Sequence, residues 1–338
     1  MATFGINRLN WSSLAALDVS ARAAEQAGFG ALWFPDNQLR IGDVFANVLA
    51  AGRATEHSNV GTLTVNPVTR HSTVLAGSIS AVARELPGRV LLGIGIGDTA
   101  VHQAGLRPAR LAELESTVRT VRSLLAGDGV EMGWRERTTV DGARSAPVIV
   151  AASGPKTLRM AGRSADGAVI RVGTDPELIR WAYGELAAGA REAGRDPATL
   201  FVALHFHTVL SDEPDVVTAR ARVMAAGYYE VNRGLWEYLG IPWTLPALTE
   251  LQQQVVPDFH HAVDMAGAAE LVKEMPIETA LRFCIAGDGP ACRSQVERII
   301  RDAPWANHVI LQPNIVRGFA AAAGEQVVKP LRGVSRDG

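Results

Sequence analysis

The chain has 338 residues, is 47% hydrophobic and carries a formal net charge of −2. A charge this small gives no electrostatic case for a nucleic-acid partner or an anionic membrane surface. There is no apolar run of the about 18 residues that a membrane span needs, and the first ten residues do not predict a signal segment. Cys284 and Cys292 fit neither a zinc spacing nor a disulfide framework, so we expect a cytoplasmic protein without a bound metal.

Buried strand patterns alternate with amphipathic helix patterns along most of the chain. The clearest unit runs from Gly61 to Asp98, where a strand, a helix and a second apolar strand follow one another. This order predicts two parallel strands joined by a right-handed crossover. Eight such strands are predicted, with helices between them, at 3–6, 31–34, 60–65, 89–94, 147–152, 167–171, 200–210 and 308–311.

Repetition of this kind favours a (β/α)8 TIM barrel with insertion segments over a doubly wound sheet. Residues 280–285 form a further extended piece that competes for the eighth strand position. We expect a single domain over residues 1–338, with a surface excursion or short hairpin at 127–146.

The region 211–278 breaks the alternation and predicts a helical insertion. Loops this long usually carry function, so the insertion is expected to form a lid or a substrate wall. Its aromatic residues, which we expect to be exposed, either line a substrate pocket or belong to an insertion core or an oligomer contact, and they favour a homodimer: Tyr228, Tyr229, Trp236, Tyr238 and Trp243.

A ligand of a parallel α/β protein lies at the carboxyl ends of its strands. One such end, Gly95 to Ala100, formally fits the dinucleotide fingerprint G-x-G-x-x-G/A. It follows the fourth strand, however, and the next helix is predicted only from about residue 108, which disfavours a nicotinamide site. The glycines suit a close approach to a flat ligand, and Asp98 places a carboxylate where desolvation makes it an acid or a base.

Three further sets of candidate binding residues stand at predicted strand ends or on a predicted strand, and a fourth lies in the insertion. Residues 151–155, Ala-Ala-Ser-Gly-Pro, open a helix with small side chains and predict an anion site at its N-terminus. Asp36 and Asn37 follow the second strand. They are either turn residues or part of the site, and their position at a strand end favours the site. His205 and His207 share one face of a strand, where a satisfied or pocket-lining pair is favoured over a metal site. His260 and His261 are expected to line a substrate pocket or to belong to the insertion core or an oligomer contact.

Three stretches together resemble the bacterial-luciferase-like flavin and deazaflavin oxidoreductases, in particular their methylenetetrahydromethanopterin-reductase-like branch. They are NPVTRH after the third strand, GRVLLGIGIGD at the fourth, and PVIVAASGPKTLRMAGRSADGAVI across the fifth and sixth. The similarity covers nearly the whole chain and is weakest over 211–278. It implies a luciferase-like (β/α)8 barrel, usually a homodimer, that binds coenzyme F420 or reduced FMN.

The resemblance also implies roles for single residues. A non-prolyl cis peptide is expected at Leu63–Thr64, behind the cofactor ring. Asp36 matches the acidic residue of the family after the second strand, whereas Asn37 replaces a histidine and Asn7 a glutamate. Asparagine cannot shuttle a proton, so acid–base work falls on Asp98. The residues expected to hold the cofactor are Leu63, Thr64, Gly95, Ile96 and Gly97 at the ring, and Ala151, Ala152, Ser153 and Gly154 at the phosphate.

The favoured function is therefore hydride transfer between coenzyme F420 and a small organic substrate, with Asp98 or a bound water supplying the proton. The alternative is an FMN-dependent monooxygenase that receives reduced flavin from a partner reductase and closes a dry pocket with its lid. A binding or sensing protein without turnover, a metal-dependent hydrolase and a nicotinamide enzyme stay open as lesser alternatives.

Overall fold

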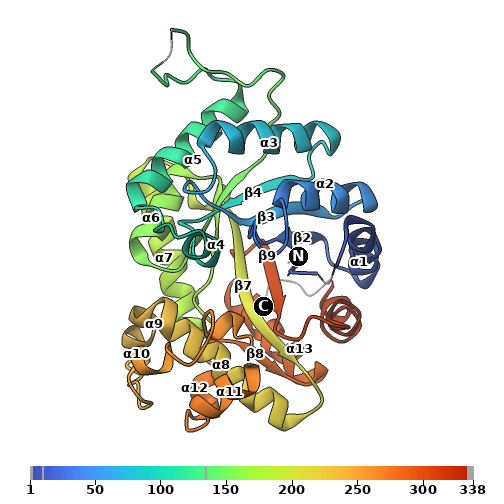
Figure 1. The fold of residues 1–338 in the computed structure, drawn as a ribbon, viewed down its shortest axis with the longest axis vertical. Helices are drawn as coiled ribbons and strands as arrows, with labels where there is room; N and C mark the ends of the chain where they lie inside the picture. Colours follow the sequence, from blue (N-terminus) through green and yellow to red (C-terminus); the bar gives the residue numbers. More distant parts are fainter. Residues whose placement is uncertain (1–2, 10, 134, 333–338) are drawn as a thin grey trace.

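The computed structural model describes residues 3–9, 11–133 and 135–332 (Figure 1). Its centre is a closed barrel of eight parallel strands, in the order β6-β5-β4-β3-β2-β1-β9-β7, with β6 pairing to β7. This confirms the predicted (β/α)8 barrel. The strands are β1 (Thr3–Asn7), β2 (Ala31–Phe34), β3 (Asn59–Val65), β4 (Val90–Ile94), β5 (Val148–Ala152), β6 (Gly167–Ile170), β7 (Phe201–Leu210) and β9 (His308–Pro313).

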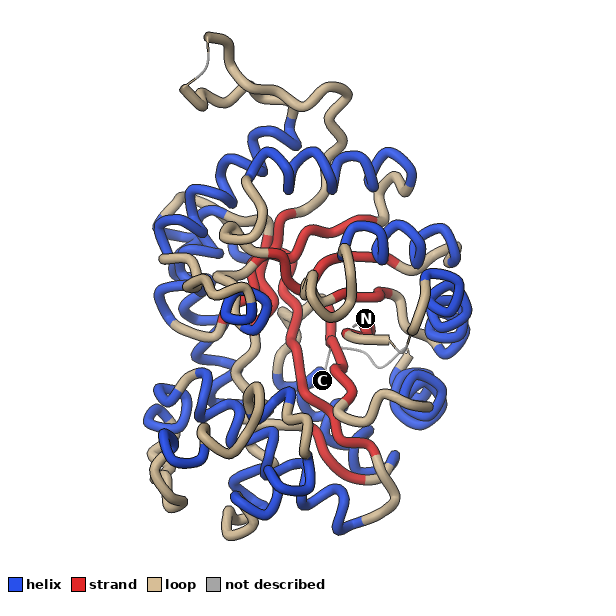
Figure 2. The backbone as a smooth tube through the Cα atoms, viewed as in Figure 1, coloured by secondary structure: helices blue, strands red, loops and turns tan. Residues whose placement is uncertain are grey.

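Helices surround the strands on the outside of the barrel (Figure 2). The first shows why its residues form a helix: Ser13 caps its N-terminus, and Gly28 ends it at φ 110°, a conformation that suits glycine. Helices that surround the barrel are α1 (Leu14–Ala27), α2 (Val44–Ala54), α3 (Ser72–Glu85), α5 (Leu111–Ala126), α6 (Pro155–Ser164), α7 (Pro176–Glu192), α13 (Gly289–Asp302), α14 (Phe319–Ala323), η3 (Gly324–Val328) and α15 (Lys329–Leu331).

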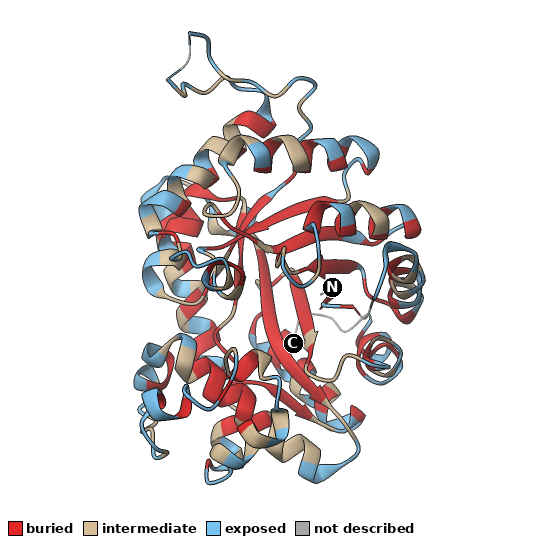
Figure 3. Cartoon of the chain, viewed as in Figure 1, coloured by how far each residue is buried: buried red, intermediate tan, exposed pale blue. Residues whose placement is uncertain are grey.

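Alternation along the strands divides the core in two. Side chains that point outward pack between the barrel and its helices, in the largest buried cluster. Side chains that point inward fill the barrel as a separate cluster of Ala31, Trp33, Leu63, Leu91, Ile149, Val169, Ala203 and Ile310. The strands are accordingly buried on both faces (Figure 3).

The competing eighth strand lies outside the barrel. Residues 277–280 form a short helix, α12 (Ile277–Ala280), and the extended piece is β8 (Ile285–Gly287), which starts where the predicted one ends. It pairs only with the far end of β7, at Thr208 to Leu210. The eighth barrel position belongs to β9, between β7 and β1.

The segment between β7 and β8 is helical, as predicted, but its aromatic side chains are mostly covered. Tyr228 and Trp236 are each 2% exposed, and Tyr229 stacks on Trp243 at 4.0 Å. Only Tyr238 of the five is an exposed side chain. The expectation of an exposed aromatic surface is wrong, because these rings pack on one another and on Phe283. The helices are α8 (Pro214–Val231), α9 (Arg233–Tyr238), α10 (Leu248–Leu251), η2 (Phe259–His261) and α11 (Met265–Leu271).

The stretch after α5 is the surface excursion that the sequence predicts. It projects from the body at the top of Figure 1, and its two arms touch in one antiparallel bridge between Val130 and Thr138. No helix among the described residues has the length and apolar character to cross a bilayer.

Candidate active site

The backbones of β3 and β4 approach each other unusually closely at the barrel rim. A Cβ on Gly93 would lie 2.1 Å from the carbonyl oxygen of Thr62, so only glycine fits there. The Thr62 hydroxyl donates to the Gly93 carbonyl oxygen at 2.8 Å, and the register between the strands shifts just after it. The Leu63–Thr64 peptide within this irregularity is cis, which confirms that prediction.

The loop after β4 continues this glycine-lined surface. A Cβ on Gly95 would lie 3.0 Å from the Thr64 hydroxyl, and Gly97 adopts φ 86° with no room for a side chain beside Val101. Ile96, between them, is 44% exposed although it is a large apolar residue. An apolar side chain standing free beside two glycines leaves a face against which a flat ring could pack.

Asp98 follows directly and is exposed. Its side chain is 62% accessible, and its carboxylate lies 3.4 Å from Nδ1 of His102. A short helix, α4 (Thr99–Gln103), begins right after it, so the expectation that the next helix starts near residue 108 is wrong. The Asp98 carboxylate is therefore open to water.

Asp36, at the end of β2, has the opposite environment. Its side chain is fully buried and forms an ion pair with Arg70, which also contacts Asp43 at 3.1 Å. Burial raises the pKa of Asp36 even though Arg70 opposes the shift. Its Oδ1 has no hydrogen-bond partner among the described residues. The adjacent Asn37 instead meets the amide of Gln103 at 3.1 Å, and so fixes this loop to α4.

The loop between β5 and α6 leaves a helix N-terminus open. Gly154 is the N-cap, supplies no capping side chain, and has nothing within 4 Å of the place where a Cβ would stand. The first intrahelical bond is donated by the Leu158 N–H, and Pro155 has no N–H, so the N–H groups of Lys156 and Thr157 are the first-turn donors available to an anion. Ser153 adds a contact with the insertion, because its carbonyl oxygen accepts from Asn232 at 3.2 Å. Ala151 and Ala152 precede this loop as the end of the strand.

The predicted histidine pair lies inside the rim and is satisfied by polar neighbours. His205 lies 3.5 Å from the Asn7 amide, which donates to Gln312 at 2.9 Å. His207 accepts from Arg171 at 3.0 Å. Burial lowers the pKa of His205 to about 3 and that of His207 well below its ordinary value, so both are neutral at neutral pH. Within the described ranges, no three histidine, cysteine or acidic side chains are arranged to hold a metal ion.

Sequence reasoning missed Arg171 and the position of His260. Arg171 directly follows β6, and its Nη2 lies 2.8 Å from Nδ1 of His260, which belongs to the insertion. The available signal was a cation placed immediately after a buried strand, in the run Ala168 to Arg171. No local pattern marks His260 as its partner.

Residues 7–304 match the family model described as "Luciferase-like monooxygenase". The chain belongs to this family. It is 30% identical to 5,10-methylenetetrahydromethanopterin reductase of Methanolobus tindarius over 66% of the chain and 70% of that protein. It is 29% identical to F420-dependent glucose-6-phosphate dehydrogenase of Microbacterium testaceum over 91% of each. The F420-dependent tetrahydromethanopterin reductase of Methanopyrus kandleri shares the fold, with a TM-score of 0.77, 22% identity and coverage of 97% and 99% of the two chains.

Unpartnered polar atoms indicate that the rim of this luciferase-like barrel accommodates a polar ligand. Seven buried side-chain nitrogen or oxygen atoms lack a hydrogen-bond partner among the described residues, and five of them belong to strand ends, the loop after β2 or the insertion residue beside Arg171. Buried polar atoms are normally paired, so such a concentration fits a large ligand with polar edges. The five belong to Asn7, Asp36, Gln38, Arg171 and Tyr228.

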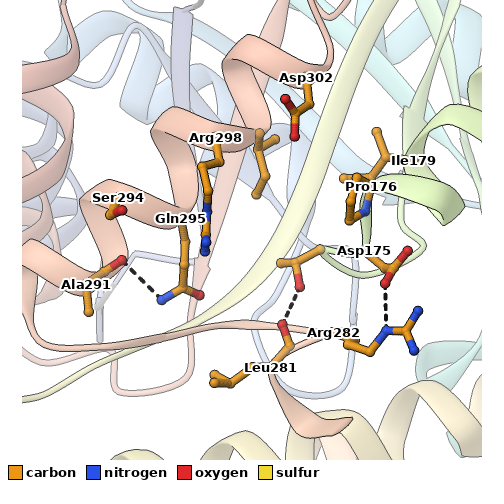
Figure 4. Close-up of a pocket in the computed structure, with 12 residues that line it drawn as sticks. Asp175, Pro176, Ile179, Leu281, Arg282, Ala291, Ser294, Gln295, Arg298 and Asp302 are labelled. Atoms are coloured by element: carbon orange, nitrogen blue, oxygen red, sulfur yellow. Dashed lines mark hydrogen bonds and ion pairs between the residues drawn. The ribbon is translucent and has the colours of Figure 1, made fainter. Parts of the chain in front are cut away.

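A separate groove of about 490 Å³ lies outside the barrel, between α7 and α13 (Figure 4). The ion pair of Arg282 with Asp175, at 2.6 Å, stands at its edge, and Arg298 and Asp302 line it from α13. None of the site residues predicted from the sequence lines this groove. The barrel rim, rather than the groove, is therefore the candidate active site.

Proposed function

We propose that this luciferase-like protein is an oxidoreductase that transfers hydride between coenzyme F420 and a small organic substrate. The observation that carries the proposal is the convergence of the three predicted cofactor segments. The ends of β3, β4 and β5 are adjacent in the barrel, so residues 63–64, 95–97 and 151–154 share one rim. A relative named as an F420-dependent glucose-6-phosphate dehydrogenase and a solved structure named as a coenzyme F420-dependent tetrahydromethanopterin reductase support the same cofactor.

Each segment has a physical role in holding the cofactor. Leu63 and Thr64 would back the ring, while Gly95 and Gly97 let the backbone approach it and Ile96 packs against its edge. The open N-terminus of α6 would bind the phosphate through backbone amides, with the exposed Lys156 in the first turn adding positive charge. When bound there, coenzyme F420 supplies the hydride or accepts it.

Proton transfer is assigned to Asp98, with Asp36 as the second candidate. Asp98 is accessible now and would lose water when cofactor and substrate cover the rim, which tunes a carboxylate for acid–base work. Burial raises the pKa of Asp36, but its carboxylate is engaged in a buried ion pair with Arg70. We therefore assign proton transfer to Asp98. Asp36 would instead stabilise the loop that carries Asn37.

A second candidate function is an FMN-dependent monooxygenase supplied with reduced flavin by a partner reductase. The family description names monooxygenases, and the insertion covers part of the rim, as a reaction that must exclude water requires. A homodimer and a cytoplasmic location stay predictions under either function.

The two functions differ in their use of oxygen. Reduced F420 is incubated anaerobically with a panel of carbonyl and unsaturated compounds, and its reoxidation is followed by visible absorbance. Reduced FMN is tested in parallel with oxygen and the same panel. Reoxidation of F420 that depends on both protein and substrate supports hydride transfer. Oxygen uptake with FMN that yields an oxygenated product, without any F420 turnover, would replace it with the monooxygenase.

A further inference from the structure

The guanidinium of Arg171 is held at the barrel rim by uncharged partners. Its Nη2 lies 3.0 Å from Nε2 of His207 and 2.8 Å from Nδ1 of His260. His260 has its other nitrogen, Nε2, 3.1 Å from the carbonyl oxygen of Met224. Since that oxygen can only accept, Nε2 of His260 carries the proton and Nδ1 accepts from the arginine.

The positive charge of Arg171 is not neutralised by these neighbours. Burial lowers the pKa of His207 and of His260 well below the ordinary value, so both rings are neutral. Against its burial, the hydrogen bond with His261, at 2.8 Å, and then the charge of Arg171 lower the pKa of Asp258, but this carboxylate makes no ion pair with the arginine within 4.0 Å. Among the described residues Arg171 forms no ion pair within 4.0 Å, unlike the partly buried Arg70.

Two hydrogen-bond donors in this cluster have no acceptor. Nε of Arg171 is buried and unpartnered. The Tyr228 hydroxyl is 2% exposed; its oxygen is influenced by the Arg171 guanidinium and the Gly173 N–H, but its own proton has no acceptor among the described residues. The guanidinium lies over the Tyr228 ring at 5.6 Å, and burial raises the pKa of this phenol to about 12 despite the nearby Arg171. The phenol therefore keeps its proton. A cation and two free donors call for a ligand that accepts hydrogen bonds and is negatively charged.

The surrounding backbone holds this arrangement in place. A Cβ on Gly227 of α8 would lie 2.5 Å from Cδ2 of His260, so glycine lets the imidazole lie flat on the helix. Gly173, two residues after the arginine, adopts φ 91° and packs against Arg282 and Phe283. Close backbone contacts at Gly227 and at Gly173 thus hold His260 and the loop after Arg171 in place.

We propose that Arg171 and Tyr228 bind an anionic group, a carboxylate or a phosphate, on the substrate. This inference rests on the proposed function and names its substrate class. The cofactor phosphate is assigned to the N-terminus of α6, whereas every side-chain partner of Arg171 belongs to β7 or to the insertion. The insertion helices therefore form the substrate side of the rim, and a neutral substrate would leave the cation and both donors unsatisfied.

Anion binding is measured by calorimetric titration with inorganic phosphate and, separately, with acetate. The protein is saturated with coenzyme F420 so that the cofactor phosphate site is already filled, and chloride keeps the ionic strength constant. The variants are Arg171→Gln and Tyr228→Phe, the second of which removes one hydroxyl and preserves the ring. Arg298→Gln is the matched control, because it removes an exposed arginine from the groove in Figure 4.

Wild type and Arg298→Gln are expected to bind at least one of the two anions saturably. Arg171→Gln should weaken that binding by about tenfold or more, and Tyr228→Phe by about three- to tenfold, as lost charge-assisted hydrogen bonds predict. Circular dichroism checks folding, and Tyr228→Phe carries the test if Arg171→Gln does not fold.

The proposal is overturned if neither anion binds, if both site variants bind like wild type, or if Arg298→Gln alone is impaired. It is also overturned if phosphate competes with F420 and Arg171→Gln weakens F420 binding equally, since Arg171 would then hold the cofactor phosphate. If F420 does not bind at all, the proposed function fails, and the titrations on the protein alone still test the anion site.

Discussion

The imidazole rings of His207 and His260 stack with their centroids 4.3 Å apart and their planes 7° from parallel. One ring belongs to β7 and the other to the insertion, so this contact joins the barrel rim to the segment that covers it. A second contact does the same on the neighbouring side, where Asn232 of the insertion donates to the carbonyl oxygen of Ser153. The insertion is therefore part of the candidate active site.

Gly227→Ala is expected to destabilise the protein by about 1–3 kcal/mol, the usual cost of overpacking. The new methyl group would lie 2.5 Å from the His260 ring and would force it out of the stack. The matched control is Gly184→Ala in α7, which meets nothing within 4 Å and should stabilise by about 0.5–1 kcal/mol because alanine favours a helix. Urea unfolding measures both; equal effects would show that the stack is loose.

Gly154→Asp is expected to stabilise the fold slightly while it weakens F420 binding by about tenfold or more, the effect of a like charge at an anion site. An acidic N-cap suits the helix but repels a phosphate bound to its amides. Gly154→Ser, a neutral N-cap at the same open position, is the control and should retain most of the affinity. Undiminished F420 binding by the aspartate variant would place the phosphate elsewhere.

Asp98→Asn is expected to reduce turnover by about 10²- to 10⁴-fold, the contribution of one positioned acid or base, and to leave F420 affinity largely unchanged. Asp36→Asn should instead lower stability, because it leaves Arg70 without its buried partner. Steady-state kinetics and thermal unfolding of both variants separate the two roles. Normal turnover in the Asp98 variant would remove this residue from the mechanism.

The protein is expected to lose stability as the pH falls below about 6.5, through its buried histidines. The pKa of His205 is lowered from 6.5 to about 3, so the unfolded chain takes up a proton that the folded chain refuses. Stability is then complete above pH 6.5 and declines toward pH 3, by up to about 1.4 kcal/mol per pH unit for one such group. Urea unfolding of His205→Gln should show a shallower decline than wild type. His57→Gln, at a side chain that is 87% exposed, should leave the decline unchanged; equal declines in all three would contradict the assignment.

The barrel, and the backbone geometry of the segments that we propose to hold the cofactor, could be predicted because their signals are local. Strand patterns, the glycines at residues 95 and 97, and the small residues at 151–154 each record a close backbone approach or a helix start within a few positions. The short helix α4 could not be predicted, since it has only five residues and no capping side chain. Periodicity needs several turns to emerge.

The side of the rim that we propose for the substrate could not be predicted, for a different reason. The contact of Arg171 with His260 joins distant parts of the chain, and only the packing of the insertion brings them together. The same packing buries Trp236 against Phe283. Aromatic composition alone therefore predicted, wrongly, that these rings are exposed. Long-range contacts of this kind leave no trace in spacing.

The most direct test of the account is a titration of the purified protein with coenzyme F420 and, separately, with FMN, each oxidised and reduced. Binding is followed by the intrinsic fluorescence of the seven tryptophans. We predict micromolar binding of F420 and much weaker binding of FMN, with the Gly154→Asp variant impaired toward F420. Tight FMN binding with no measurable F420 binding would contradict the deazaflavin assignment and favour oxygen chemistry at the same rim.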